Sequence, residues 1–346
     1  MTASKDIQDI VQNADKIVVL QADNPDADSL GSALALEQIL GEMGKDVTLY
    51  CGIDMPSYLK YLQGWDRVSQ ELPAQFDASI IVDASTMTLF QKLSESGHQG
   101  WVAAKPAIVL DHHKQVDNRV PFANVTVNDT GSSSTGELIY KLSKELEWPL
   151  DATSGEFIMT AILGDTQGLT NDLTNAETYR IMSELVSLGV SRPALEDRRR
   201  EYTKMPPEIF RYKARLIERT EFHADGKVAL VTVPQAEITE FSPLYNPAPL
   251  IQNDMLQTAG VGVAMVLKSY TDGKILCAIR CNTDYPVGAE LATSFGGGGH
   301  PYASGFKIQS GRPLAEVKSE CIVKATALID ALTQGSSDET TQHTHA

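Results

Sequence analysis

Several apolar segments of this chain end in side chains that can bind a metal ion. The side chains are carboxylates and imidazoles, namely Asp26 and Asp28, Asp83, Asp111-His112-His113, and Asp165. Carboxylates held within a few ångströms of one another cannot all stay ionised without a cation, because like charges raise each other's pKa. A divalent metal ion would resolve this conflict, and two ions about 3.5–4 Å apart form the usual clamp for displacement at phosphorus. These residue types therefore predict metal-dependent chemistry on phosphoryl compounds.

The segments that position these side chains have the pattern of buried strands. We expect strands at 16–20, 46–50, 78–82 and 107–110, separated by mostly helical stretches. This alternation predicts an α/β domain with a parallel, doubly wound sheet. Ligands of such sheets bind outside the carboxyl ends of the strands, so the acids that follow the strands could converge on one site.

Two helix starts are expected close to this site. Ser29 can cap the helix that follows Asp28, and the N–H groups at that helix end could hold a phosphate oxygen. The cluster Ser132-Ser133-Ser134 has two interpretations, a cap with linker, which we favour, or hydroxyls that approach a substrate. Residues 152–163 are interpreted as a buried helix that ends at Asp165.

Together these motifs resemble the four motifs of the DHH phosphoesterases. The matching residues are Pro25-Asp26-Ala27-Asp28, Asp83, Asp111-His112-His113 and Asp165. Gly296 to His300, followed by Ala303-Ser304-Gly305-Phe306, resembles the signature of the DHHA1 domain. The resemblance spans roughly residues 15–330. It implies a DHH domain (1–189), a helical linker (190–224), a smaller α/β DHHA1 domain (225–334) and a polar tail (335–346) that we expect to be disordered.

The resemblance also implies a role for each site residue. One metal ion would be held by Asp28, Asp83, His112 and Asp165, and Asp83 would bridge to a second ion bound also by Asp26. The mixed carboxylate and imidazole set favours manganese over magnesium. Asp111 would orient a histidine, and His113 would lie beside the substrate as a phosphate contact or proton donor. Attack by a metal-bound hydroxide would then cleave the ester.

One ligand position departs from the family pattern. The family has a histidine four residues before Asp26, where this chain has Ala22. An alanine cannot ligate, which leaves Asp26, Asp83 and water, or a neighbour such as Gln21 or Asp23. We therefore predict weak or substrate-assisted occupancy of this metal site.

A glycine run in the second domain is the candidate anchor for substrate. Gly297, Gly298 and Gly299 would let backbone N–H groups approach an anion, and we favour this nest over a flexible linker. The resemblance implies that Arg280 and His300 hold the far phosphate or nucleotide end of the substrate.

Composition limits the partners. The formal net charge of −16 argues against a protein that tracks long nucleic acid, whereas short RNA and mononucleotides remain possible. No apolar run reaches membrane-spanning length, and the four cysteines form no C-x-x-C pair, so we expect a cytoplasmic protein. A homodimer is common in members of this family.

The resemblance implies a nano-RNase-like hydrolase, an oligoribonuclease and exonuclease that cleaves short oligoribonucleotides, linear dinucleotides or 3'-phosphoadenosine 5'-phosphate. A cyclic dinucleotide phosphodiesterase is the nearest rival. A RecJ-like exonuclease is disfavoured by the acidic charge, and a family II pyrophosphatase by the glycine run. A nucleotide-binding protein with reduced turnover is the alternative from another class, because Ala22 replaces a ligand.

Overall fold

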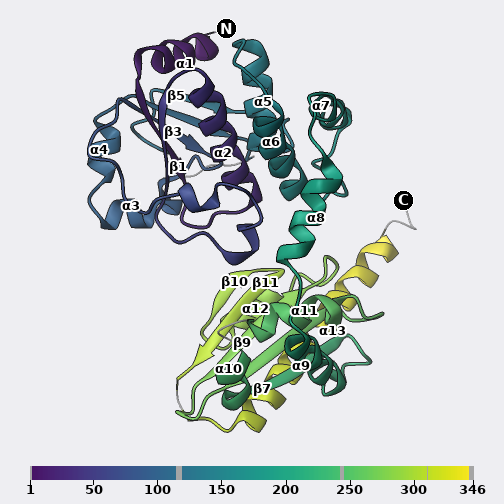
Figure 1. Cartoon of the computed structure of the whole chain (residues 1–346). Coiled ribbons are helices and arrows are strands. Elements are labelled where there is room, and N and C mark those ends of the chain that lie inside the picture. Colours follow the sequence, from purple (N-terminus) through teal and green to yellow (C-terminus); the bar gives the residue numbers. More distant parts are fainter. Residues whose placement is uncertain (1, 114–118, 242–244, 310, 343–346) are drawn as a thin grey trace. The chain divides into compact units, whose positions relative to one another are not determined.

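The chain folds into two compact units, Met1–Lys204 and Met205–Ala346. A computed structural model describes residues 2–113, 119–241, 245–309 and 311–342. Figure 1 shows the first unit in purple to teal and the second in green to yellow. Each unit has its own sheet and its own apolar core.

The first unit is built on a parallel sheet of five strands in the order β2-β1-β3-β4-β5. Every neighbouring pair in it is parallel, which confirms the predicted doubly wound α/β domain. The strands are β1 (Lys16–Gln21), β2 (Asp46–Cys51), β3 (Ala78–Val82), β4 (Ala107–Asp111) and β5 (Val125–Asn128). β5 was not among the predicted strands, and it is short and has only one fully buried residue.

Helices cover both faces of this sheet (Figure 1). Alternate residues of β1 pack into two different apolar clusters, with Val19 facing one and Val18 the other. The cluster that contains Val19 is formed with α1 (Thr2–Asn13), α2 (Ala27–Glu42), α5 (Thr135–Glu145), α6 (Ala152–Asp165) and α7 (Ala176–Ser187). The opposite cluster takes residues from α3 (Gln91–Glu95) and α4 (Gln99–Ala103).

The strand order reverses at β1, whose neighbours are β2 on one side and β3 on the other. At such a switch point the chain leaves the two strands in opposite directions and opens a crevice beyond their carboxyl ends. The loop with Asp26 and Asp28 follows β1, and Asp83 follows β3. The fold therefore brings these acids to the crevice from two neighbouring strands.

The second unit contains a mixed sheet of six strands in the order β10-β11-β9-β8-β7-β6. Only β7 and β8 pair in parallel. The strands are β6 (Glu221–His223), β7 (Val228–Pro234), β8 (Val263–Ser269), β9 (Ile275–Cys281), β10 (Gly298–His300) and β11 (Ala303–Ile308). One face packs on α12 (Gly288–Thr293) and α13 (Leu314–Gln342), the other on α9 (Pro207–Glu218), α10 (Gln235–Phe241) and α11 (Pro247–Leu256).

The residues expected to form a helical linker are divided between the two units. Helix α8 (Arg192–Tyr202) places Leu195 in the core of the first unit, whereas α9 places Leu216 in the core of the second. The boundary between the two units therefore lies after Lys204, within the range expected for the helical linker.

The chain end also differs from expectation, because α13 continues to Gln342 through much of the tail predicted to be disordered. Each residue added to an existing helix gains a hydrogen bond without a new nucleation cost. In the described part of the chain, no helix is both long and apolar enough to cross a bilayer.

Candidate metal centre

Asp26, rather than Ser29, caps helix α2. One carboxylate oxygen of Asp26 accepts hydrogen bonds from the N–H groups of Asp28 and Ser29, each at 3.0 Å. The Ser29 hydroxyl in turn accepts from the Asp26 N–H at 3.0 Å, which completes a capping box. The predicted cap at Ser29 is therefore wrong by three positions, because Ser29 is the third helical residue of the same capping box.

The N-terminus of α5 holds Asp28 in place. The Asp28 carboxylate is fully buried and accepts hydrogen bonds from the backbone N–H groups of Thr135 and Gly136, at 2.7 and 3.0 Å. The Ser32 hydroxyl donates a third bond at 3.0 Å. The positive end of the α5 dipole therefore faces this carboxylate.

The serine cluster before α5 acts as a cap. The Ser134 hydroxyl oxygen accepts from the Glu137 N–H at 3.0 Å, and the Ser133 hydroxyl donates to the Glu137 carboxylate at 2.6 Å. Both serines are buried. The structure therefore confirms the cap, which Ser134 forms.

Asp83 adopts a backbone conformation that is unusual for a residue other than glycine. Its φ is +59°, in the left-handed region, directly after the last residue of β3. Aspartate tolerates this region better than most residues, but such strain concentrates at functional sites. The Thr135 hydroxyl donates to Asp83 Oδ1 at 3.0 Å, so one threonine contacts Asp28 through its N–H and Asp83 through its side chain.

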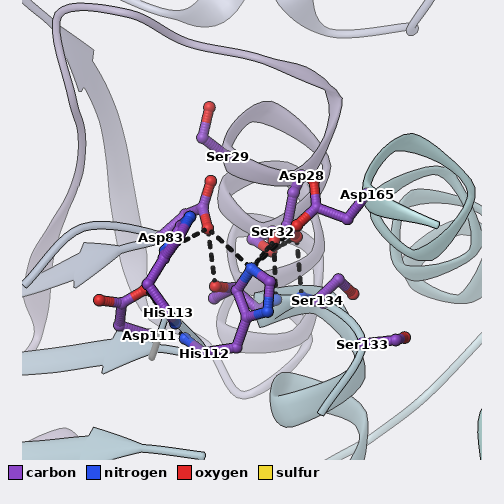
Figure 2. Close-up of polar contacts among 12 residues, drawn as sticks. Asp28, Ser29, Ser32, Asp83, Asp111, His112, His113, Ser133, Ser134 and Asp165 are labelled. Atoms are coloured by element: carbon purple, nitrogen blue, oxygen red, sulfur yellow. Dashed lines mark hydrogen bonds and ion pairs between the residues drawn. The ribbon is translucent and has the colours of Figure 1, made fainter. Parts of the chain in front are cut away.

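His112 lies at the centre of the carboxylates (Figure 2). Its Nε2 atom is 2.9 Å from Asp165 Oδ2, 3.5 Å from Asp28 Oδ2 and 3.7 Å from Asp83 Oδ1. The imidazole is buried, yet none of these contacts has the geometry of a hydrogen bond, and Nε2 has no other partner in the described part of the chain. A buried nitrogen aimed between three carboxylates is the arrangement expected around a bound cation.

The electrostatics of the centre also favour a cation. Burial, followed by the charges of Asp28 and Asp26, raises the pKa of Asp83 well above its ordinary value. Burial and the charge of Asp165 raise the pKa of Asp28 in the same direction. Burial by itself would lower the pKa of His112, but the carboxylates of Asp165 and Asp28 outweigh it and raise that pKa to about 9. Without a metal ion, protons compensate the excess negative charge.

The Asp111 carboxylate contacts the imidazole of His113, and it also accepts a hydrogen bond from the backbone N–H of His112 at 2.9 Å. Asp111 Oδ1 lies 2.7 Å from His113 Nδ1, and the Ser85 hydroxyl donates to the other oxygen. Burial alone would raise the pKa of Asp111, but the hydrogen bonds from His113 and Ser85 lower it. The hydrogen bond to Asp111 also raises the pKa of His113.

The ligand atoms form two groups that could each hold an ion. One consists of Asp28, His112 and Asp165, and the other of Asp83, His112 and His113, with the ligand atoms of each group within 4.8 Å of one another. The first group fits a divalent cation well, since it supplies two oxygens and one imidazole nitrogen. Asp26, expected to hold the second ion, belongs to neither group, and one of its oxygens is used in capping α2.

Among the described residues, Asp23 belongs to neither group of candidate metal ligands. The Ala22 side chain packs in the apolar cluster on the α3 side of the sheet. Asp23 Oδ2 accepts a hydrogen bond from the Lys92 N–H at 2.8 Å. Gln21 is fully buried, and alternation along β1 directs it to the face opposite Ala22.

The predicted substrate anchor lies in the second unit. Gly298 and Gly299 belong to β10, which pairs antiparallel with β11. A Cβ atom on Gly297 would lie 2.2 Å from the Gly305 oxygen, and one on Gly299 would lie 2.6 Å from Ser304 Cα. These two glycines are therefore required for the close approach of β10 to β11, a packing role that the sequence analysis did not consider.

Arg280 and His300 flank one small residue of this sheet. Ala303 on β11 pairs with Arg280 on β9 and with His300 on β10. Directly paired residues point to the same face, so the two basic side chains stand on either side of Ala303, roughly 10 Å apart. Both are exposed.

Comparison with known proteins agrees with this geometry. Residues 16–162, which contain Asp26, Asp28, Asp83 and His112, match the model of the DHH family, N-terminal domain. This part of the chain is therefore similar to the N-terminal domain of the DHH family. The chain is 26% identical over 315 residues to the bifunctional oligoribonuclease and PAP phosphatase NrnA of Bacillus subtilis (strain 168), covering 89% of this chain and 95% of that protein.

One solved structure and one further protein extend the comparison. A crystal structure of an exopolyphosphatase-related protein from Bacteroides fragilis shares the fold, with a TM-score of 0.78 at 24% identity, over 95% of this chain and 98% of that one. The cyclic-di-AMP phosphodiesterase PdeA of Listeria monocytogenes is 25% identical over 86% of this chain, but the match covers only 45% of PdeA.

Two residues of the DHH domain that contact the site were missed from sequence. Thr135 bonds to both Asp28 and Asp83, and Ser85 donates to Asp111. Thr135 follows the serine cluster and begins α5, so the only available signal was a polar residue at a helix start. Ser85 lies two residues after Asp83, and no motif distinguishes it.

Proposed function

We propose that this DHH-family phosphoesterase hydrolyses short oligoribonucleotides, linear dinucleotides and 3'-phosphoadenosine 5'-phosphate. One observation carries the proposal: the buried Nε2 atom of His112, which forms no hydrogen bond with any described residue, faces three carboxylates from three separate segments. Such a group of ligands is suited to a divalent cation beside a phosphoryl group. The similarity to NrnA along nearly the full length of both proteins supports the substrate class.

Asp28, Asp83, His112 and Asp165 would hold the cation. When bound, a divalent cation polarises a phosphoryl oxygen and lowers the pKa of a coordinated water molecule toward neutral pH. Helix α5 would fix the position of the cation, because two of its N–H groups hold the Asp28 carboxylate rigidly. Asp165 is the most exposed of the four ligand side chains. We favour manganese from the mixed oxygen and nitrogen donors.

His113 and Asp111 would act on the substrate side of the centre. The His113 side chain is 55% exposed, while its Nδ1 atom is held by buried Asp111. With Nδ1 held by Asp111, Nε2 on the other side of the exposed ring can contact a phosphate or donate a proton. The raised pKa of His113 favours the protonated form that both roles need.

Arg280 and His300 would bind the substrate in the second unit. Arg280 offers a planar pair of donors for phosphate, and His300 lies across Ala303 from it. The four free, buried cysteines agree with a protein of the reducing cytoplasm. The homodimer that the family resemblance implies stays a prediction.

A nucleotide-binding protein with reduced turnover is the second candidate, because Ala22 takes a ligand position. A turnover assay separates the two functions. Purified protein with manganese should hydrolyse di- to pentanucleotides and 3'-phosphoadenosine 5'-phosphate, and Asp165→Asn should abolish this activity. Binding of the same compounds without hydrolysis would support the second candidate. Hydrolysis of cyclic dinucleotides in preference to linear ones would instead point to a PdeA-like activity.

A further inference from the structure

A pocket of about 530 Å³ lies within the first unit, beside the loop that carries Asp26 and Asp28. This volume falls in the range of sites for small molecules, about 300–1,000 Å³. No residue of the predicted site lines the pocket. Its walls come from the loop after β2, the C-terminal part of α6 and helix α8, and include Tyr58, Tyr61, Gly164, Arg192, Arg199 and Arg200.

The pocket and the metal centre share two chain segments. Ala27 lines the pocket and lies between Asp26 and Asp28, while Gly164 lines it and directly precedes Asp165. The two segments touch, since a Cβ atom on Gly164 would lie 2.8 Å from Ala27 Cβ. A ligand in this pocket would therefore lie next to a phosphoryl group bound at the metal centre.

The charge of the pocket is opposite to that of the chain. Three arginines and a single acid, Glu196, line it, although the whole chain carries a net charge of −16. Arg199 and Arg200 share Glu196, at 2.8 and 3.0 Å. Arg192 is exposed and has no hydrogen-bond or ion-pair partner among the described residues. The uncompensated positive charge favours an anion, and arginine matches phosphate geometry well.

A fixed aromatic ring lies on the wall nearest the metal loop. The Tyr58 hydroxyl donates to the Pro25 carbonyl at 3.0 Å, directly before Asp26. The residue nevertheless stays 56% exposed and lines the pocket. A ring held at its hydroxyl end and open on its face suits stacking with a nucleobase, which is tolerant of base identity.

We propose that this pocket binds a second nucleotide unit of an oligonucleotide substrate, next to the scissile phosphate. Its base stacks on Tyr58, and its phosphate meets Arg192 and the arginine pair on α8. The proposal rests on the proposed function. It adds a physical reason for a preference between oligonucleotide and mononucleotide substrates. An oligonucleotide fills the pocket, whereas a mononucleotide such as 3'-phosphoadenosine 5'-phosphate leaves it empty.

The test compares kcat/KM for a dinucleotide and a trinucleotide with that for 3'-phosphoadenosine 5'-phosphate, all with manganese. Tyr58→Ala and Arg192→Gln should lower the ratio of oligonucleotide to mononucleotide kcat/KM at least about fivefold. Tyr58→Phe keeps the ring and should retain the ratio. Tyr179→Ala and Lys105→Gln serve as controls, because both residues are exposed and lie outside the pocket. Tyr179 is 56% exposed, as Tyr58 is.

Equal losses on all three substrates would overturn the proposal, because they would indicate that Tyr58 acts only through the metal loop. Anisotropy of a fluorescent, non-hydrolysable dinucleotide separates this proposal from the proposed function. A chain that binds the probe without cleaving any substrate refutes the function, and weaker binding by Tyr58→Ala and Arg192→Gln still supports the pocket. Unchanged binding by both variants, or no binding by the wild type, overturns it.

Discussion

The Nε2 atom of His112 lies 2.9 Å from Asp165 Oδ2, which joins the end of β4 to the end of α6. The contact is too poorly directed to be a hydrogen bond, and two more carboxylates approach the same nitrogen. The site is therefore better suited to a cation than to a direct ion pair.

Replacing Asp83 with asparagine should have opposite effects with and without metal. Asparagine keeps the acceptor for Thr135 and tolerates the positive φ of this position. It removes one of several repelling, buried carboxylates, so the metal-free protein should melt higher, by about 2–4 °C for each kcal/mol of repulsion relieved. The variant should lose most of the further increase in Tm that manganese gives the wild type.

Differential scanning calorimetry with and without manganese measures both effects. Asp46→Asn changes an exposed acid at the start of β2 and should leave both values as in the wild type. A full manganese response in Asp83→Asn would show that Asp83 does not bind the ion.

Metal binding should release protons at neutral pH. The pKa of His112 is raised to about 9 by its carboxylate neighbours, so the metal-free imidazole is protonated at pH 7. The cation needs the neutral ring, and its affinity should therefore rise with pH, about tenfold per unit for each proton displaced, until pH 9. Calorimetric titration in two buffers of different ionisation enthalpy counts these protons. Identical heats in both buffers at pH 7 would contradict the expectation.

Replacing each of two glycines of α2 with alanine should have contrasting effects on the free energy of unfolding. A Cβ atom on Gly31 would lie 2.7 Å from the Phe157 oxygen and 3.2 Å from the Ala161 nitrogen, both backbone atoms of α6. Gly31→Ala must push α2 and α6 apart and should cost about 1–3 kcal/mol of unfolding free energy. Gly41 has open space around its Cβ position, so Gly41→Ala should be neutral or stabilising by up to about 1 kcal/mol. Urea denaturation of both variants decides this, and similar effects would refute the close helix contact.

Restoring the missing imidazole should strengthen a second metal site. The Ala22 position packs on the α3 side of the sheet, next to the crevice that Asp26 and Asp83 border. In Ala22→His we expect a second equivalent of manganese to bind at least about 10-fold more tightly. Native mass spectrometry at increasing manganese concentration counts the ions. Two tightly bound ions in the unaltered chain would contradict the predicted weakness of this site.

The sequence predicted four of the five strands of the first sheet and the acids beyond them, because both signals are local. Apolar runs mark β1, β3 and β4, and parallel strands must bring their carboxyl ends to one edge. The cap of α2 was misplaced, since Asp26 and Ser29 form one reciprocal box and either could begin the helix. Only the positions of the N–H groups distinguish them.

Features that depend on tertiary contacts could not be predicted. The bonds from Thr135 to Asp28 and Asp83 join segments far apart in sequence. The amino-acid composition does not indicate the left-handed backbone conformation of Asp83. The pairing of β10 with β11 could not be predicted either, because glycine has a low propensity for β-strands.

The central claim is that Asp28, His112 and Asp165 bind a divalent cation, and anomalous diffraction from crystals grown with manganese tests it most directly. The account predicts a manganese peak within coordination distance of His112 Nε2 and of carboxylate oxygens from Asp28 and Asp165. It also predicts that the peak disappears in Asp165→Asn. A map without a peak there at saturating manganese, with His112 bonded directly to Asp165, would contradict the account.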